Sequence, residues 1–173
     1  MVYFLEQNQE LVSYPKDMEE DNLVDLYRTE SSKSISDEAE SRLNSMIPMK
    51  ERIRLRSISL QKLVLKDQNH PDLIPALLER LGPVRTALDG HGGGIVIKKI
   101  ENENDGQLSF ILTLNGACIA CGAAPSTLVG IKYDLENDSE INAIYFEDEL
   151  LETFDDLSKE FLKSRTNICF KST

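Results

Sequence analysis

Apolar residues follow a regular spacing only in the part of the chain after residue 69. Between residues 73 and 88 they recur three and four positions apart, which is the spacing of one face of a helix. Asn69 and Asp72, on either side of Pro71, indicate the start of that helix. Gly82-Pro83 then interrupts the pattern, and proline lacks the backbone donor that a helix interior needs. The segment predicts a helix kinked or divided near residue 82, containing these apolar residues: Leu73, Ile74, Leu77, Leu78, Leu81, Val84 and Leu88.

The next pattern is typical of a β-hairpin. A strand is expected at about residues 95–101, and Asn104-Asp105-Gly106 is a strong turn signal. The return strand, at about residues 108–114, alternates apolar and polar positions, with Ser109 and Thr113 on its polar face. Such alternation suits an antiparallel strand with one buried face.

A helix, a strand and a second helix are expected to complete the fold. The helix runs from about Pro125 to Glu136, and the third strand covers residues 141–146. Apolar residues between Leu150 and Leu162 then predict one amphipathic C-terminal helix. The expected order is helix, β-hairpin, helix, strand, helix. This order predicts the α+β class, with a small mixed three-stranded sheet and the helices on one of its faces.

Charge divides the 173-residue chain, whose net charge is −11, into unequal parts. Residues 1–49 carry eleven acidic and four basic side chains and include a serine-rich stretch, so an acidic, partly disordered N-terminal arm is expected. Residues 50–66 have a net charge of +5 and form a basic connector. We expect the folded domain to occupy residues 67–164 and a flexible tail to occupy residues 165–173.

The basic connector has two interpretations. Its arginines and lysines can form a docking surface for an acidic partner. Alternatively, the segment is a solvated connector that pairs with the chain's own acidic tail. The sequence leaves both open.

The overall charge and the absence of certain segments weigh against several classes of protein. A negative chain is poorly suited to non-specific nucleic-acid binding, which needs a cationic surface. The sequence contains no run of roughly 18 apolar residues, so no membrane span is expected. Residues 1–6 lack the basic region and the long apolar stretch of a secretory signal. These features predict a cytoplasmic protein.

The chemistry-bearing residues are Cys118 and Cys121, which form a C-x-x-C motif flanked by Gly116 and Gly122. The two thiols follow a strand and precede a helix, whose free amide hydrogens stabilise negative sulfur. The flanking glycines let the backbone turn tightly and approach an inorganic group. The spacing by itself is compatible with a dithiol redox pair, half of a zinc site, half of an iron–sulfur site or two inert cysteines. The other soft metal ligands stand in no recognised spacing: His70, His91 and Cys169.

Residues 71–146 resemble the C-terminal domain of NifU, the Nfu-type family of iron–sulfur cluster scaffold and carrier proteins. The resemblance depends on a leucine-rich helix, a glycine cluster, a hairpin and Gly-Ala-Cys-x-x-Cys in that order. The matching stretches are Pro83-Val84-Arg85, His91-Gly92-Gly93-Gly94-Ile95, Leu114-Asn115-Gly116-Ala117-Cys118-Ile119-Ala120-Cys121, Thr127-Leu128 and Gly130-Ile131.

This resemblance implies that Cys118 and Cys121 hold half of a [4Fe-4S] cluster, which bridges a homodimer. It further implies transfer of the cluster from upstream assembly machinery to apo iron–sulfur client proteins, without catalysis of a reaction. Two departures from the family pattern are His91, where an acid is usual, and Gly122-Ala123-Ala124, where a proline–serine run is usual.

Three questions stay open at the level of sequence. The alternative function is a thiol-disulfide oxidoreductase that uses the same two cysteines. His91 is either an auxiliary ligand or proton donor, or a polar turn residue. Cys169 either traps clusters or is a bystander near the chain end.

Overall fold

The computed structural model describes residues 3–5, 11–13, 37–38, 40–90, 92–103, 105–119 and 122–173. The chain divides into two compact units, Met1–Ser41 and Arg42–Thr173. In the first unit, β1 (Tyr3–Leu5) pairs antiparallel with β2 (Leu11–Ser13). Most of the predicted disordered arm lies outside the described residues. Everything that follows concerns the second unit.

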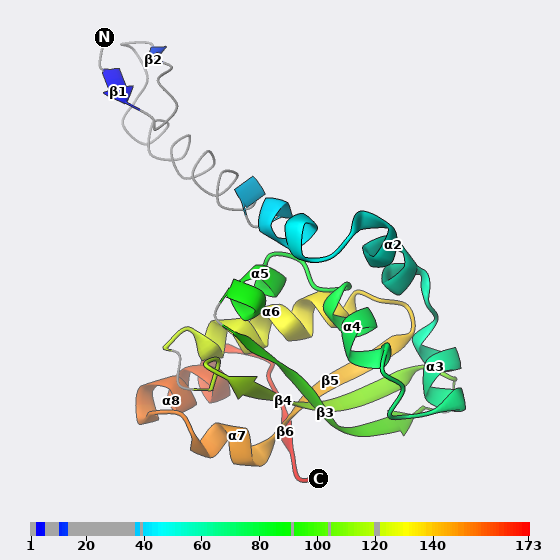
Figure 1. The fold of residues 1–173 in the computed structure, drawn as a ribbon. Coiled ribbons are helices and arrows are strands. Elements are labelled where there is room, and N and C mark those ends of the chain that lie inside the picture. The colour runs from blue at the N-terminus through cyan, green and yellow to red at the C-terminus, as the bar shows by residue number, and fades with distance from the viewer. Residues whose placement is uncertain are drawn as a thin grey trace. The chain divides into compact units, whose positions relative to one another are not determined.

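The second unit is organised around a four-stranded mixed sheet in the order β3-β4-β5-β6 (Figure 1). The predicted hairpin is formed by β3 (Gly93–Asn102) and β4 (Leu108–Gly116), which are antiparallel. Next to β4 lies β5 (Ile141–Glu147), and next to β5 lies β6 (Phe170–Lys171), both pairs being parallel. The predicted α+β class is therefore confirmed. The predicted count of three strands is wrong by one, because β6 is too short to leave a periodic pattern in the sequence.

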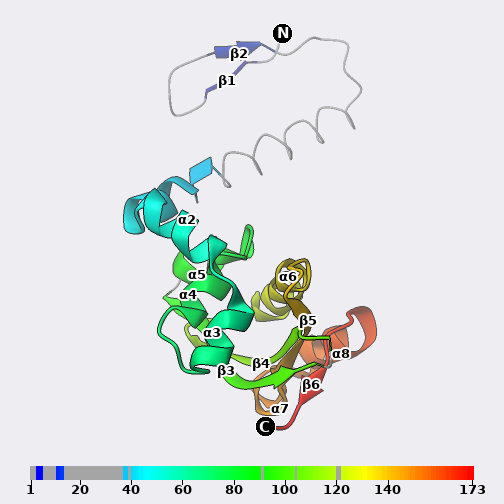
Figure 2. The same ribbon diagram turned by 90° about the vertical axis from the view of Figure 1, so that its right-hand side faces the viewer.

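The apolar face of the sheet packs against helices. As expected, Gly82-Pro83 divides the first predicted helix into α4 (Leu73–Leu78) and α5 (Val84–Gly90). Between β4 and β5 the chain crosses over through α6 (Ala124–Glu136), which lies along one face of the sheet (Figure 2). The largest fully buried side chains of this core come from both layers: Phe110, Phe146, Leu73, Leu77, Leu88, Leu108, Leu112, Leu128, Ile131 and Leu135.

The single C-terminal helix predicted from the sequence is two helices, α7 (Asp148–Glu152) and α8 (Asp156–Arg165). Asp155 starts the second one, since its carboxylate accepts a hydrogen bond of 2.7 Å from the backbone N–H of Ser158. That bond holds the pKa of the Asp155 carboxyl below its usual value. Leu150, Phe154 and Leu162 nevertheless all reach the same core.

Both faces of β4 are buried, whereas the alternation predicted one buried face. On the second face, Ser109 and Ile111 are 0% and 1% exposed. The Ser109 hydroxyl donates to Glu103, and the Lys171 ammonium lies 3.5 Å from the centre of the Tyr145 ring. Because β4 has a strand on each side, long polar side chains of its neighbours can cover it on this face.

The predicted basic connector, residues 50–66, is part of the compact unit. It contains α2 (Met49–Ser57) and α3 (Leu60–Lys66), and the core includes Leu60, Leu63 and Val64. Arg80 fixes the connection between the two helices by donating to the Ile58 carbonyl at 2.8 Å. The unit therefore begins at Arg42, well before the predicted domain boundary at residue 67.

The predicted flexible tail, residues 165–173, contains the last strand of the sheet. Ile168 is buried, and the rings of Phe170 and Phe146 have centroids 6.4 Å apart. The Phe146 N–H also donates to the Cys169 carbonyl at 3.0 Å. These contacts attach residues 168–171 to the edge of the sheet. Among the described residues, none of the helices has the length and apolar character needed to span a bilayer.

Candidate functional site

The candidate site lies where the hairpin opens, at the start of β3 and the end of β4. Gly93 pairs with Gly116 there, and Gly94 pairs with Asn115. The backbone of Gly116 has a φ of 62°, which favours glycine. A Cβ on Gly116 would lie only 2.4 Å from the Gly92 carbonyl oxygen. The close approach of the two strand ends thus requires glycine at residue 116.

Cys118 occupies the turn that follows this strand end. The Ile119 N–H donates to the Gly116 carbonyl at 3.4 Å, which reverses the chain direction. The Cys118 side chain is 6% exposed, and its sulfur lies directly over Gly93. A Cβ on Gly93 would be 1.9 Å from the sulfur. The absence of a side chain at Gly93 therefore creates the space in which the thiol lies.

Only one of the two predicted cysteines can be placed. Cys121 and His91 lie outside the described residues, so their predicted roles stay predictions. The predicted position of Cys118 between a strand and a helix is confirmed, because Cys118 follows β4 and α6 begins six residues later.

Two hydroxyl groups in the first turn of α6 bond to the backbone at the start of the helix. The Ser126 and Thr127 hydroxyls both donate to the Ala123 carbonyl, at 2.8 and 3.1 Å. Gly122 has no comparable constraint, since a Cβ there would meet no described atom within 4 Å, and its φ is not positive. The expectation that both flanking glycines are needed for a tight turn therefore holds for Gly116 and is not supported for Gly122.

The remaining soft ligands are not brought to this loop within the described part of the chain. Cys169 lies beside β6, two strands away from β4, and is exposed. His70 lies between α3 and α4, where its Nδ1 accepts a 3.2 Å hydrogen bond from the Asp72 N–H. Over the residues that are described, no three His, Cys, Asp or Glu side chains gather as a metal site.

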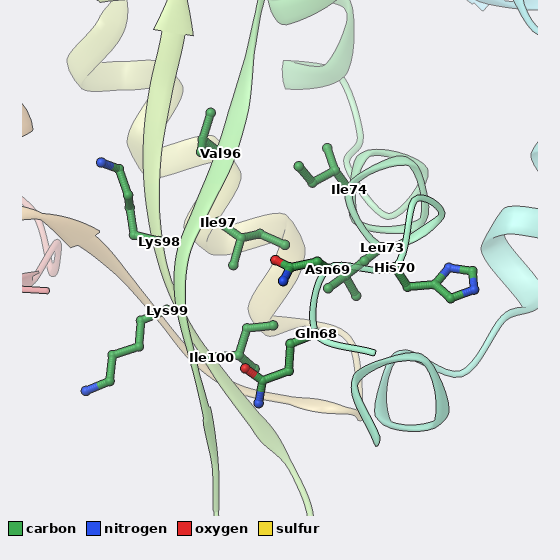
Figure 3. A pocket seen from close by; sticks show the side chains of 10 residues that line it. All are labelled: Gln68, Asn69, His70, Leu73, Ile74, Val96, Ile97, Lys98, Lys99 and Ile100. Carbon is green, nitrogen blue, oxygen red and sulfur yellow. The ribbon is translucent and has the colours of Figure 1, made fainter. Parts of the chain in front are cut away.

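A cavity of about 200 Å³ lies elsewhere, between β3 and the segment that joins α3 to α4 (Figure 3). The side chains of Gln68 and Asn69 point toward β3, whereas the ammonium ends of Lys98 and Lys99 extend away from the segment that joins α3 to α4. The imidazole of His70 also turns away from the strand. The lining combines amide and aliphatic residues with His70, Lys98 and Lys99, and it does not include Cys118.

Gly93 is the residue whose role the sequence did not reveal. The sequence showed Gly93 as part of a glycine cluster, but it did not indicate a contact with a thiol. Glycine at the start of a strand weakens that strand and often marks a close approach by another group. That signal was present in residues 92–94.

No protein-family model, curated protein or solved structure matches this chain.

Proposed function

We propose that this protein is an iron–sulfur cluster carrier that uses Cys118 and Cys121. Two chains would together supply the four thiolates that a [4Fe-4S] cluster takes, and the homodimer would pass the cluster to apo-proteins. The cluster is cargo in this scheme, so the protein is not an enzyme. The cytoplasmic location expected from the sequence belongs to the same proposal.

The observation that carries the proposal is the position of Cys118. Its sulfur lies over Gly93 at the open end of the hairpin, and α6 begins six residues later. The chain order of strand, thiol and helix is the order in which a helix N-terminus can stabilise a thiolate, and the thiolate is the form that binds iron. The resemblance to the C-terminal domain of NifU in residues 71–146 adds the expected partner ligand, Cys121.

A cysteine thiol is a suitable ligand for an iron–sulfur cluster. Because Cys118 is buried, however, it must become accessible before it can bind iron. The residue as a whole is only 6% exposed, so little of it is accessible to a second chain. Binding of iron therefore requires the turn at residues 117–119 to rotate the sulfur away from Gly93. Release of the cluster to a client would let the sulfur return to that space.

Anaerobic reconstitution with iron and sulfide tests the proposal. The expected product is a dimer with about four irons and four sulfides, broad visible absorption, and the ability to activate an apo [4Fe-4S] enzyme. Cys118→Ser and Cys121→Ser should each abolish binding, whereas Cys169→Ser should bind normally because that residue lies two strands away.

A colourless monomer would refute the carrier proposal. If that monomer instead forms an intramolecular disulfide and catalyses thiol exchange, the alternative function as a thiol-disulfide oxidoreductase is supported.

A further inference from the structure

The basic segment at residues 50–66 separates into two classes of cation in the structure. Its arginines make contacts within the unit. Arg52 pairs with Glu79 at 3.1 Å, and Arg56 donates to the Glu79 carbonyl at 2.6 Å. Arg54 binds both Glu51 and Asp72, and these hydrogen bonds hold the pKa values of the two carboxyls below their usual range. The arginines thus pair within the unit, with Glu51, Asp72 and Glu79, whereas the solvated connector was expected to pair with the chain's acidic tail.

The lysines of the same segment face outward. Lys50, Lys62 and Lys66 are exposed, and no ion pair or hydrogen bond of their ammonium groups is found within the described residues. Two of them, Lys62 and Lys66, are one helical turn apart on α3 and share a face. No carboxylate in the described part of the chain compensates these charges, although the chain as a whole has a net charge of −11.

Large apolar side chains accompany these lysines on the same helix faces. On α2, Met49 and Ile53 are 50% and 62% exposed and lie opposite the buried Leu55. On α3, Leu65 is 81% exposed and lies three residues from Lys62. Both helices occupy the flank that faces the viewer in Figure 2, in front of α4. We name these six side chains the outer face of α2 and α3: Met49, Lys50, Ile53, Lys62, Leu65 and Lys66.

We propose that the outer face of α2 and α3 is a docking surface for an acidic, amphipathic segment of a partner protein. Exposed apolar groups surrounded by charge are typical of interaction sites. The lysines, which have no ion-pair partner among the described residues, determine the chemistry of the occupant. Carboxylates on the partner would complement their ammonium groups. The apolar side chains would supply burial, and the lysines would orient the partner and speed its association. This proposal does not depend on cluster binding.

The test uses the full chain and a fluorescein-labelled, helix-forming peptide with glutamates on one face and leucines on the other. Fluorescence anisotropy should show binding that weakens with salt, and a peptide with glutamine in place of glutamate should bind about tenfold more weakly. The double variant K62E/K66E should lose about tenfold in affinity, and I53S/L65S should lose a similar factor.

The matched control is K163E/R165E, which reverses two exposed charges in the last turn of α8 and should bind the peptide as the wild type does. Thermal melting verifies that each variant is folded. The proposal is overturned if the glutamine peptide binds equally well or if the α8 control loses the same affinity. It is also overturned if I53S/L65S dissociates a dimer of this chain, or if vesicles with 30% anionic lipid bind better than the peptide.

Discussion

At the scale of single residues, a side chain that is absent determines the site. The Cys118 sulfur lies where the Cβ of any other residue at position 93 would be. At Gly116 the constraint is different, because both the positive φ and the nearby Gly92 carbonyl require glycine. Glycine at residue 93 therefore leaves the space that the thiol occupies.

Gly93→Ala should push the Cys118 sulfur out of its space. We expect alkylation of Cys118 by iodoacetamide to become several-fold faster, measured in a Cys121→Ser/Cys169→Ser background so that one thiol reacts. The added methyl group should also lower the free energy of unfolding by about 1–3 kcal/mol.

Gly122→Ala is the matched control for this prediction, because a Cβ there has open space. It should leave both the alkylation rate and the stability unchanged. Equal rates in the wild type and Gly93→Ala would mean that Gly93 does not determine the position of the sulfur.

At the scale of elements, the sequence predicted the helices and strands that carry a long periodic pattern. It did not predict the elements that are too short to carry one. The hairpin, α6 and β5 match their predictions closely, since each carries several apolar residues at one spacing. The two-residue strand β6 carries no period at all. Only its parallel pairing with β5 makes it a strand.

Phe170→Ala tests whether β6 is part of the folded unit. Removal of a partly buried aromatic ring that faces Phe146 should lower the free energy of unfolding by about 1–3 kcal/mol. Urea unfolding measures this loss. Cys169→Ala, which changes an exposed neighbour, should have little effect on the free energy of unfolding. If Phe170→Ala also leaves it unchanged, the prediction of a flexible tail is supported instead.

At the scale of the whole unit, residues 50–66 belong to the core because of contacts that are distant in sequence. Glu140 accepts from the Leu60 N–H at 2.6 Å and from the Ser59 hydroxyl at 2.5 Å. Arg80 joins the same region, since it pairs with Asp138 at 2.7 Å. These polar contacts attach α3 to the turn that precedes β5.

Two leucines on α3 provide the matched test of that attachment. Leu60→Ala removes a fully buried side chain and should lower the free energy of unfolding by about 2–5 kcal/mol. Leu65→Ala, on the exposed face of the same helix, should change it by less than about 0.5 kcal/mol. Denaturant titrations of both variants give the comparison. If neither variant changes the free energy of unfolding, residues 50–66 form a solvated connector and are not part of the core.

The sequence by itself determined the α+β class, the hairpin, the division of the helix at Gly82-Pro83, and the position of Cys118 between a strand and a helix. Each of these follows from local spacing or from the backbone chemistry of glycine and proline. Only the tertiary structure decided that the sheet has a fourth strand, that residues 50–66 pack into the core, and that the Cys118 sulfur lies over Gly93. Those features depend on residues that are far apart in the chain, and their contacts leave no periodic signal in either partner.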